Sequence, residues 1–351
     1  MPRKLVIFLL ALLFAAPLHA QFFLTGDDPG SLRWFSVETP HYQIVYPRGA
    51  DSLARVYGTY LEQFRMPMGK SIGQIPGEGW RRKMPVVLHT YYPYSNGSVV
   101  CAPWRMDLYT MPEAYGADPV PWAVQLASHE PRHQAQLQLS AQGFMKPFPY
   151  VVGQAWNAVG WVLYFDSSMG EGDAVAAETG LADGTRAYTA DFLNYIRVAL
   201  DQGDYRSWAR WYYGSYKHYT PDLYKISYMA QAGGRYLTDN PMFTSDVIRR
   251  SLRHPWPFSP RSFQRLITSA TGDKNFGQAF PKLMDAFNEV WQASDRERAP
   301  FLELDPVFAA ESFPVDYSSP VWADGRLFVV RSGYVRTPEL VEGAGGKALR
   351  R

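Results

Sequence analysis

Cysteine is almost absent from this sequence: Cys101 is the only one in 351 residues. A single thiol excludes an internal disulfide, so the fold must be stabilised by its hydrophobic core. Cys101 lies in the apolar stretch SVVCAPW, residues 98–104. This setting favours a buried small side chain over a nucleophile, because no histidine neighbours the cysteine in sequence.

An excess of either charge is also missing, since 35 Lys and Arg residues accompany 33 Asp and Glu residues, for a net charge of +2. No long basic run occurs, so the sequence gives no reason to expect a nucleic-acid partner. Hydrophobic residues make up 46% and charged residues 19%, which is typical of a globular protein. The length is enough for one or two domains.

Beyond residue 20, no stretch resembles a membrane helix. The first twenty residues are different, because Arg3 and Lys4 precede an apolar run over 5–18, and Leu-His-Ala then precedes Gln21. This pattern predicts a signal peptide over 1–20, a periplasmic or extracellular protein, and no stable membrane insertion after signal removal. The alternative is an uncleaved anchor, for which the run is short.

Residues 30–140 predict the α/β part of a domain that extends over 21–300. Alternating or short apolar stretches predict strands near 33–38, 42–47, 84–90, 98–103 and 105–110, with a helix over 50–64. Residues 141–300 predict the helical part. Together with the end of the α/β part, helices are expected over 121–140, 150–166, 171–200, 222–238, 242–253, 260–270 and 276–294. The fold class expected is α+β.

The residue pattern changes again in the last segment, 301–351. YSSPVWADGRLFVVRSG, residues 317–333, predicts a strand, an Asp-Gly turn and a second strand. It is similar to the opening hairpin of a β-propeller blade, and one blade cannot bury its own faces. We expect either the start of a truncated propeller-like segment or a tail that packs on the first domain.

The stretch AVQLASHEPRHQAQLQL, residues 123–139, contains a His-Glu-x-x-His motif. His129 and His133 are four residues apart, so both imidazoles project from one side of a helix. Glu130 is rotated by about 100° from His129 and can reach a water on a metal. Zinc needs two such imidazoles, a third ligand and an open position, and it lowers the pKa of a bound water to around 7. We expect Zn²⁺ here, with Glu130 as the general base.

The stretch SSMGEGDAVAAETGLADG, residues 167–184, offers the third ligand. Glu171 and Glu178 are seven residues apart and share one helical face. We expect Glu171 to bind the metal and Glu178 to accept a hydrogen bond from a ligand imidazole. The alternative is that both carboxylates belong to a solvated helix face.

The order His-Glu-x-x-His and then Glu-Gly-x-Ala at 171–174 resembles that of gluzincin metallopeptidases. The match is closest to bacterial exported proteins in which a peptidase-MA-like domain precedes a TolB-like propeller, and it extends from about Trp34 to Ser332. The resemblance implies a zincin-like fold, a peptide or protein substrate, and zinc on His129, His133 and Glu171.

The same resemblance implies a tyrosine that stabilises the oxyanion. Tyr228 is the first choice and Tyr224 the second, with plain helix packing as the alternative for either. It also implies that the strand 105–110 is an edge strand, which pairs with an extended substrate along Met106 and Leu108. An ordinary structural strand is the alternative.

Pro131 departs from this pattern. It cannot donate to the carbonyl of Ala127, and inside a helix this costs about 3 kcal/mol or more and predicts a kink. It also disfavours the helical region for Glu130. Three outcomes follow: a bent helix that holds both imidazoles, a zinc site with Glu130 misdirected, or a degenerate site.

Three functions follow from these residues. The first is an exported zinc-dependent peptidase. The second is a catalytically impaired, zinc-binding scaffold that interacts with an envelope protein. The third is a glycan-binding or glycan-processing protein, suggested by the 11 Trp and 23 Tyr residues, although aromatic residues more often belong to a core.

Overall fold

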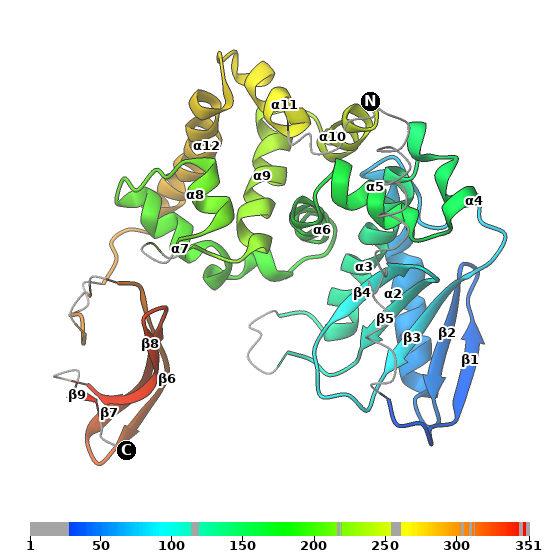
Figure 1. Ribbon diagram of the computed structural model, residues 1–351. Coiled ribbons are helices and arrows are strands. Elements are labelled where there is room, and N and C mark those ends of the chain that lie inside the picture. The colour runs from blue at the N-terminus through cyan, green and yellow to red at the C-terminus, as the bar shows by residue number, and fades with distance from the viewer. Residues whose placement is uncertain are drawn as a thin grey trace, which may run out of the picture.

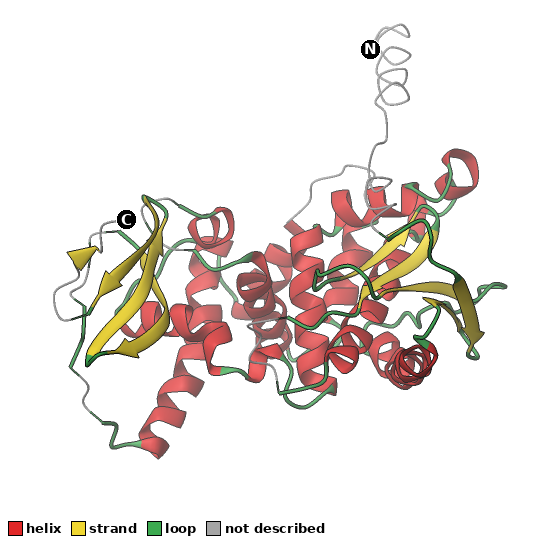
Figure 2. Ribbon diagram, turned by 90° about the horizontal axis from the view of Figure 1, so that it is seen from below, coloured by secondary structure: helices red, strands yellow, loops and turns green. Residues whose placement is uncertain are grey.

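The computed structural model describes residues 28–113, 119–215, 218, 220–253, 261–302, 305–308, 311, 313–343 and 347–348. The predicted signal peptide lies outside these residues. The described chain has the expected α+β composition, with helices and two separate sheets (Figure 1). The two sheets lie at opposite ends of the molecule, and most of the helices lie between them (Figure 2).

The first sheet has five strands in the order β1-β2-β3-β5-β4. The strands are β1 (Trp34–Glu38), β2 (Tyr42–Pro47), β3 (Met84–His89), β4 (Gly97–Cys101) and β5 (Trp104–Tyr109). The pairs β2/β3 and β3/β5 are parallel, whereas β1/β2 and β4/β5 are antiparallel. The prediction that β5 is an edge strand is therefore wrong. β5 lies between β3 and β4, and β4 forms this edge of the sheet.

Two long helices, α2 (Asp51–Lys70) and α3 (Trp122–Ser140), pack on the sheet and on each other. The alternation in β2 and β3 directs every second side chain into this layer, where Ile44, Val86 and Leu88 are fully buried. From the helices, Leu61 and Leu126 join the same core. This packing fixes α3 against the sheet, next to the edge strand.

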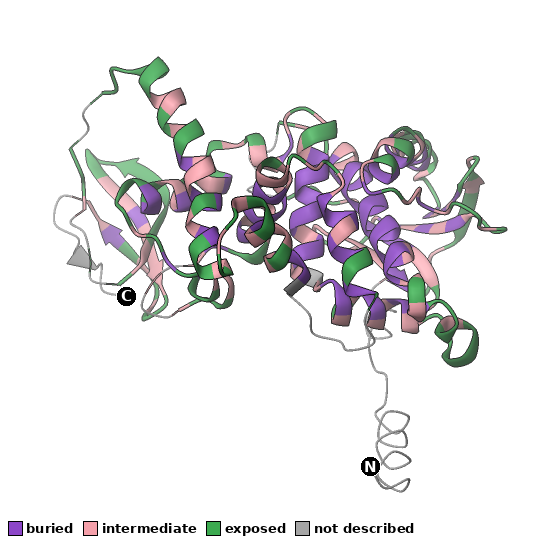
Figure 3. Ribbon diagram, turned by 90° about the horizontal axis from the view of Figure 1, so that it is seen from above, coloured by how far each residue is buried: buried purple, intermediate pink, exposed green. Residues whose placement is uncertain are grey.

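The second half of the chain is helical. Its elements are η2 (Gly143–Met145), α4 (Phe148–Val152), α5 (Trp156–Tyr164), α6 (Ser167–Leu181), η3 (Arg186–Tyr188), α7 (Ala190–Asp201), α8 (Trp208–Tyr213), α9 (Leu223–Thr238), α10 (Phe243–Ser251), α11 (Arg261–Thr271) and α12 (Phe276–Arg298). A second apolar core joins them around Trp211, Ile226 and Phe243. Buried positions are concentrated in these helices and in α3 (Figure 3).

Two of the long helices expected from the sequence are each divided in the structure. The expected helix 150–166 ends and restarts around Gly153, whose φ is 92°. The expected helix 171–200 is interrupted after Leu181, and Gly184 has a φ of 81°. Glycine adopts such angles readily, so Gly153 ends α4, whereas α6 ends at the extended Ala182, two residues before Gly184. The short helix α8 was not expected.

The second sheet is an antiparallel meander of β6 (Val315–Ala323), β7 (Arg326–Gly333), β8 (Arg336–Glu342) and β9 (Lys347–Ala348). The predicted Asp-Gly hairpin is confirmed: Asp324 and Gly325 have φ angles of 49° and 70° between β6 and β7, as a two-residue turn of this kind requires. Strand β6 is almost entirely exposed, whereas most residues of β7 are partly buried (Figure 3).

A buried cluster ties the start of the described chain to the sheet. The His89 ring, at the end of β3, lies between two carboxylates, with Nδ1 2.5 Å from Asp28 Oδ2 and Nε2 3.4 Å from Asp107 Oδ1.

None of the described helices has both the length and the apolar character needed to cross a membrane.

Candidate metal centre

The helix α3 carries both histidines of the motif. It is continuous from Trp122 to Ser140, through Pro131, and nearly all of it is buried. His129 and His133 therefore keep their one-turn separation, and their rings meet edge to face with centroids 4.7 Å apart. Pro131 does not break the helix, so the imidazole pair forms as the spacing predicts.

The helix α6 brings Glu171 to this pair. It begins after Asp166, whose side chain accepts a hydrogen bond from the Ser168 N–H as an N-cap. Next to Glu171, Gly172 touches α9 so closely that a Cβ there would overlap the backbone of Ser227. The glycine after the glutamate is thus needed for the close crossing of α6 and α9.

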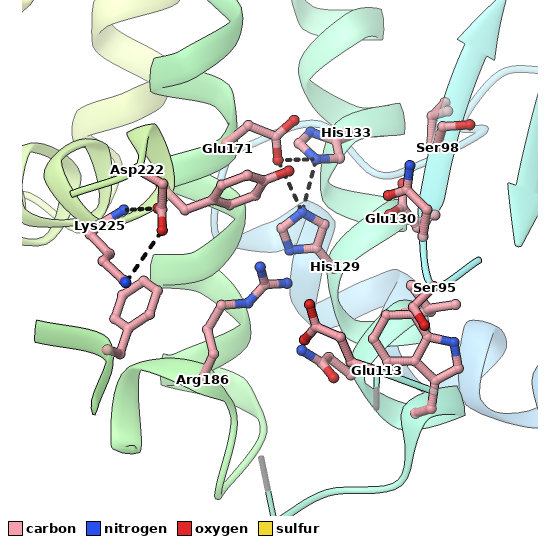
Figure 4. Close-up of a pocket in the computed structure, with 18 of the residues that line it drawn as sticks. Ser95, Ser98, Glu113, His129, Glu130, His133, Glu171, Arg186, Asp222 and Lys225 are labelled. Atoms are coloured by element: carbon pink, nitrogen blue, oxygen red, sulfur yellow. Dashed lines mark hydrogen bonds and ion pairs between the residues drawn. The ribbon is translucent and has the colours of Figure 1, made fainter. Parts of the chain in front are cut away.

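Three ligand atoms converge from these helices (Figure 4). The Nε2 atoms of His129 and His133 lie 3.0 Å apart, and Glu171 Oε2 lies 3.3 and 3.2 Å from them. Ligands on a tetrahedral zinc ion, at about 2.0–2.2 Å from it, are roughly 3.4 Å from one another. The triangle has the size that such an ion needs.

The hydrogen bonds behind the imidazoles fix which nitrogens face the centre. His129 Nδ1 is 2.8 Å from Glu178 Oε2, which only accepts. His133 Nδ1 is 2.9 Å from Gln136 Oε1, and the Gln136 amide nitrogen donates to Gly170 and Asp173 oxygens, which sets the orientation of that amide. Both Nδ1 atoms must therefore carry the proton.

When both imidazoles are neutral with the proton on Nδ1, as metal binding requires, their Nε2 lone pairs point at each other and at the Glu171 carboxylate. Three electron-pair donors within 3.3 Å repel one another unless a cation lies between them. The donor set, two imidazoles and a carboxylate with an open side, is that of a catalytic zinc site. The residues present therefore fit a divalent zinc ion.

The titration of these groups follows the same charges. Burial on its own lowers the pKa of His129, but the Glu178 charge and hydrogen bonds to both glutamates outweigh it and raise the pKa to about 10. Burial raises the pKa of Glu171, yet the two histidines hold it well below its usual range. The site thus favours positive charge, which zinc supplies without a proton.

A buried ionic network supports the centre from behind. Asp173 accepts a bidentate pair of hydrogen bonds from Arg132, at 2.6 and 2.8 Å, and a further one from Arg235. Gln136 joins Asp173 at 2.8 Å, so the network reaches the proton of His133. On the other side, Arg186 Nε donates to Glu178 at 2.7 Å. Each histidine of the centre is therefore hydrogen-bonded to a side chain whose own position is fixed by further hydrogen bonds.

Glu130 lies on the opposite side of the imidazole pair from Glu171, beside Ser98 of the edge strand (Figure 4). Its carboxylate is buried, and Oε2 has no hydrogen-bond partner among the described residues. Burial raises the pKa of Glu130, and the two imidazoles oppose that shift. A buried, unpartnered carboxylate with a raised pKa is suited to accept a proton from a reactant.

Gly97 is the reason that Glu130 can lie there. A Cβ at this position would lie 2.8 Å from Glu130 Cδ and 2.9 Å from Leu126 Cδ2. Any larger residue would force the carboxylate or the strand to move. The sequence analysis missed Gly97, although an isolated glycine in a strand signals a close approach.

The tyrosine beside the centre is Tyr224, and the first choice, Tyr228, is wrong. Tyr224 lines the cleft, its ring is 6.4 Å from that of His129, and its phenol lies close enough to Glu171 for that charge to act on it. Tyr228 instead packs against Phe192 and Phe287 in the helical core. Burial, and then the charge of Glu171, raise the pKa of Tyr224, so it keeps its proton as a donor.

The centre opens into a cleft of about 600 Å³. One wall is the turn before β4 and the start of β4, including Gly97, Ser98 and Val99. The other wall comes from η3, α7 and α9, including Arg186, Asp191, Phe192, Asp222 and Lys225. The edge of β4, which pairs with no further strand among the described residues, thus borders the cleft.

Met106 and Leu108 do not contribute to this wall. Both are fully buried in the core between the sheet and its helices, because β5 lies inside the sheet. Their predicted role as the substrate edge strand is therefore wrong, and the residues of β4 are in that position. The prediction selected the wrong strand of the β4–β5 hairpin, since both have strand patterns and only the sheet order distinguishes them.

Comparisons of the chain with protein-family models, curated proteins and solved structures give no significant match. The chemistry of the site is therefore argued from its own residues.

Proposed function

We propose that this chain is an exported zinc-dependent peptidase of the gluzincin type, with a zincin-like domain. The observation that carries the proposal is the convergence of two Nε2 lone pairs and one carboxylate oxygen within 3.3 Å. The motif order, the buried Glu130 and the cleft beside a free strand edge support it. The export signal over 1–20 supports the periplasmic or extracellular location.

In this proposal, His129, His133 and Glu171 would hold the zinc ion, which when bound would supply an acidified water and a Lewis acid for the scissile carbonyl. Glu130 accepts the proton of the attacking water and passes it to the leaving amine. Tyr224 donates a hydrogen bond to the oxygen on which negative charge develops. Glu178 and Gln136 hold the imidazoles in the tautomer that leaves both Nε2 atoms available.

The cleft also indicates how a peptide is bound. The edge of β4 offers backbone N–H and C=O groups to an extended chain, which would add to the sheet as a further strand. Such a chain would run past Glu130 and the zinc ligands, because Gly97 touches Glu130. A peptide or protein is the substrate class that this geometry fits.

Metal analysis and cleavage assays test the proposal. The purified chain should carry one zinc ion per molecule by mass spectrometry, and a mixture of internally quenched peptides should be cleaved in a chelator-sensitive manner. His133→Ala should lose both zinc and cleavage. A chain that binds no zinc after dialysis against the ion would refute the proposal.

Pro131 supports the second candidate, a zinc-binding scaffold for an envelope partner, because it disfavours the helical region for Glu130. Glu130→Gln distinguishes the two. A peptidase should keep its zinc and lose cleavage in this variant, whereas a scaffold should keep its zinc and lack cleavage before and after the substitution.

A further inference from the structure

A surface at one end of the helical half combines exposed apolar side chains with unpaired cations. We name it the α4 face and define it by Lys70, Lys146, Phe148, Tyr150, Val151, Arg250 and Arg253. It is separate from the candidate metal centre, because the cleft contains none of these residues.

The apolar part of the α4 face is exposed in the described part of the chain. Tyr150 and Val151 are 86% and 82% exposed, and α4 contains no buried residue. Pro147 and Pro149 restrict the backbone, and Phe148 stacks on Trp156 with ring centroids 5.1 Å apart. Large apolar side chains are therefore held in an exposed position by a rigid support, which marks an interaction site.

The cations of the α4 face stand at the ends of helices that border the connection into α4. Gly143, three residues before Lys146, lies against Leu252 at the end of α10. Arg249, also on α10, donates a hydrogen bond to the Gly73 carbonyl just after α2, which ends at Lys70. These contacts place the ends of α2 and α10 beside the connection that leads into α4. Figure 1 also shows α10 near that connection.

All the charged residues that define the α4 face are positive. Lys70, Lys146, Arg250 and Arg253 are exposed, and none has an ion-pair partner within the described part of the chain. No Asp or Glu occurs between Glu130 and Asp166, a stretch that contains all of α4 and α5. An anionic surface would meet attraction and no repulsion from this stretch.

We propose that the α4 face binds the surface of an anionic phospholipid bilayer. Tyr150, Val151 and Phe148 enter the boundary between headgroups and acyl chains, and the four cations contact lipid phosphates. A bilayer fits better than a protein partner, because α4 is a protruding tip and lines none of the pockets found in the described residues. This is surface binding, which needs no membrane-spanning helix.

The proposal does not depend on the peptidase, but it has a consequence for it. The backbone N–H of Trp104 donates to Gln154, two residues after α4, at 3.2 Å. Trp104 begins β5 directly after the edge strand β4. A bilayer under the α4 face would therefore lie near one end of the strand that borders the cleft.

The first experiment measures co-sedimentation of the full chain with vesicles. Vesicles of phosphatidylcholine with phosphatidylglycerol should bind the chain, pure phosphatidylcholine should bind it less, and high salt should weaken the binding. Tyr150→Ser/Val151→Ser should bind at least about tenfold more weakly. The matched control Tyr236→Ser/Val290→Ser removes side chains that are 69% and 61% exposed outside this face, and it should bind as the parent does.

A second measurement locates the contact, whatever the N-terminal segment contributes. Cys101 is buried, and burial raises the pKa of its thiol to about 11, so an introduced cysteine can be labelled selectively. An environment-sensitive fluorophore on Tyr150→Cys should shift to the blue and be shielded from an aqueous quencher when anionic vesicles are added. The same label on Tyr236→Cys should not change.

An unchanged label at position 150, or equal binding by the Ser/Ser variant, would overturn the proposal. So would self-association that the Ser/Ser variant abolishes while no vesicles are bound, because the face would then bind a second copy. Circular dichroism checks that the variants fold, as expected for exposed positions, where substitutions change stability little.

Discussion

Gly97→Ala is expected to remove most of the peptidase activity while leaving zinc in place. The added Cβ would lie 2.8 Å from Glu130 Cδ, which is 0.6 Å less than the 3.4 Å at which ordinary contacts begin (3.4 − 2.8 = 0.6), and Oε1 is nearer still. Because no hydrogen bond holds Glu130 Oε2, the carboxylate is the group that gives way. It must move by about 1 Å, and such a displacement can cost a hundredfold in rate, or about 2.7 kcal/mol.

The assay measures kcat and KM for an internally quenched peptide, together with zinc content and zinc affinity. The three atoms nearest to the new methyl group belong to Glu130 and Leu126 and to none of the residues proposed to bind zinc, so the stoichiometry should stay at one and the affinity should change little. Gly180→Ala is the matched control, because its Cβ would meet nothing within 4 Å. An alanine at 97 that leaves kcat within a factor of three would refute the reasoning, as would zinc loss that matches the loss of rate.

Three further predictions concern the tyrosine, the support of the ligands and stability. Tyr224→Phe should lower kcat by about a hundredfold, as the loss of one oxyanion donor does, and Tyr228→Phe should change it less than twofold; the reverse order would favour the original choice. Glu178→Gln should weaken zinc binding by about 10–100-fold in competition with a fluorescent chelator, and an unchanged affinity would show that the second carboxylate is dispensable. Burial on its own lowers the pKa of His89, but its two carboxylate neighbours outweigh burial and raise it, so its stabilising effect is full below about pH 6.5 and is lost as the pH rises through the folded pKa. Urea unfolding should therefore show that His89→Gln destabilises more in acid than in alkaline buffer, and a pH-independent difference would contradict this.

The local patterns of the sequence predicted most elements but not their breaks. Alternating or short apolar stretches identified each strand of the first sheet, because one face of that sheet packs on α2 and α3. The two divided helices were missed at Gly153 and Gly184, whose positive φ angles depend on how the flanking helices pack. A glycine in a helical pattern permits a break without requiring one.

The residues of the candidate metal centre could be predicted because they lie at fixed intervals on single helices. His129 and His133 share α3, and Glu171 and Glu178 share α6, so the 3.6-residue period sets their directions. The choice between Tyr224 and Tyr228 was different, since they are one turn apart on α9. The crossing of α6 and α9 at Gly172 and Ser227 decides which one reaches the metal centre, and only tertiary structure contains that information.

Pro131 shows how packing overrides a local preference. Its missing hydrogen bond costs about 3 kcal/mol, but α3 buries Leu126, Leu137 and Leu139, each worth about 1.5–3 kcal/mol. The helix therefore stays continuous, and the imidazoles keep their spacing. The remaining bias acts on the residue before the proline, Glu130. The carboxylate of that side chain lies against Gly97, and its Oε2 has no hydrogen-bond partner among the described residues, so the position of the proposed general base depends on the edge strand as much as on its own helix.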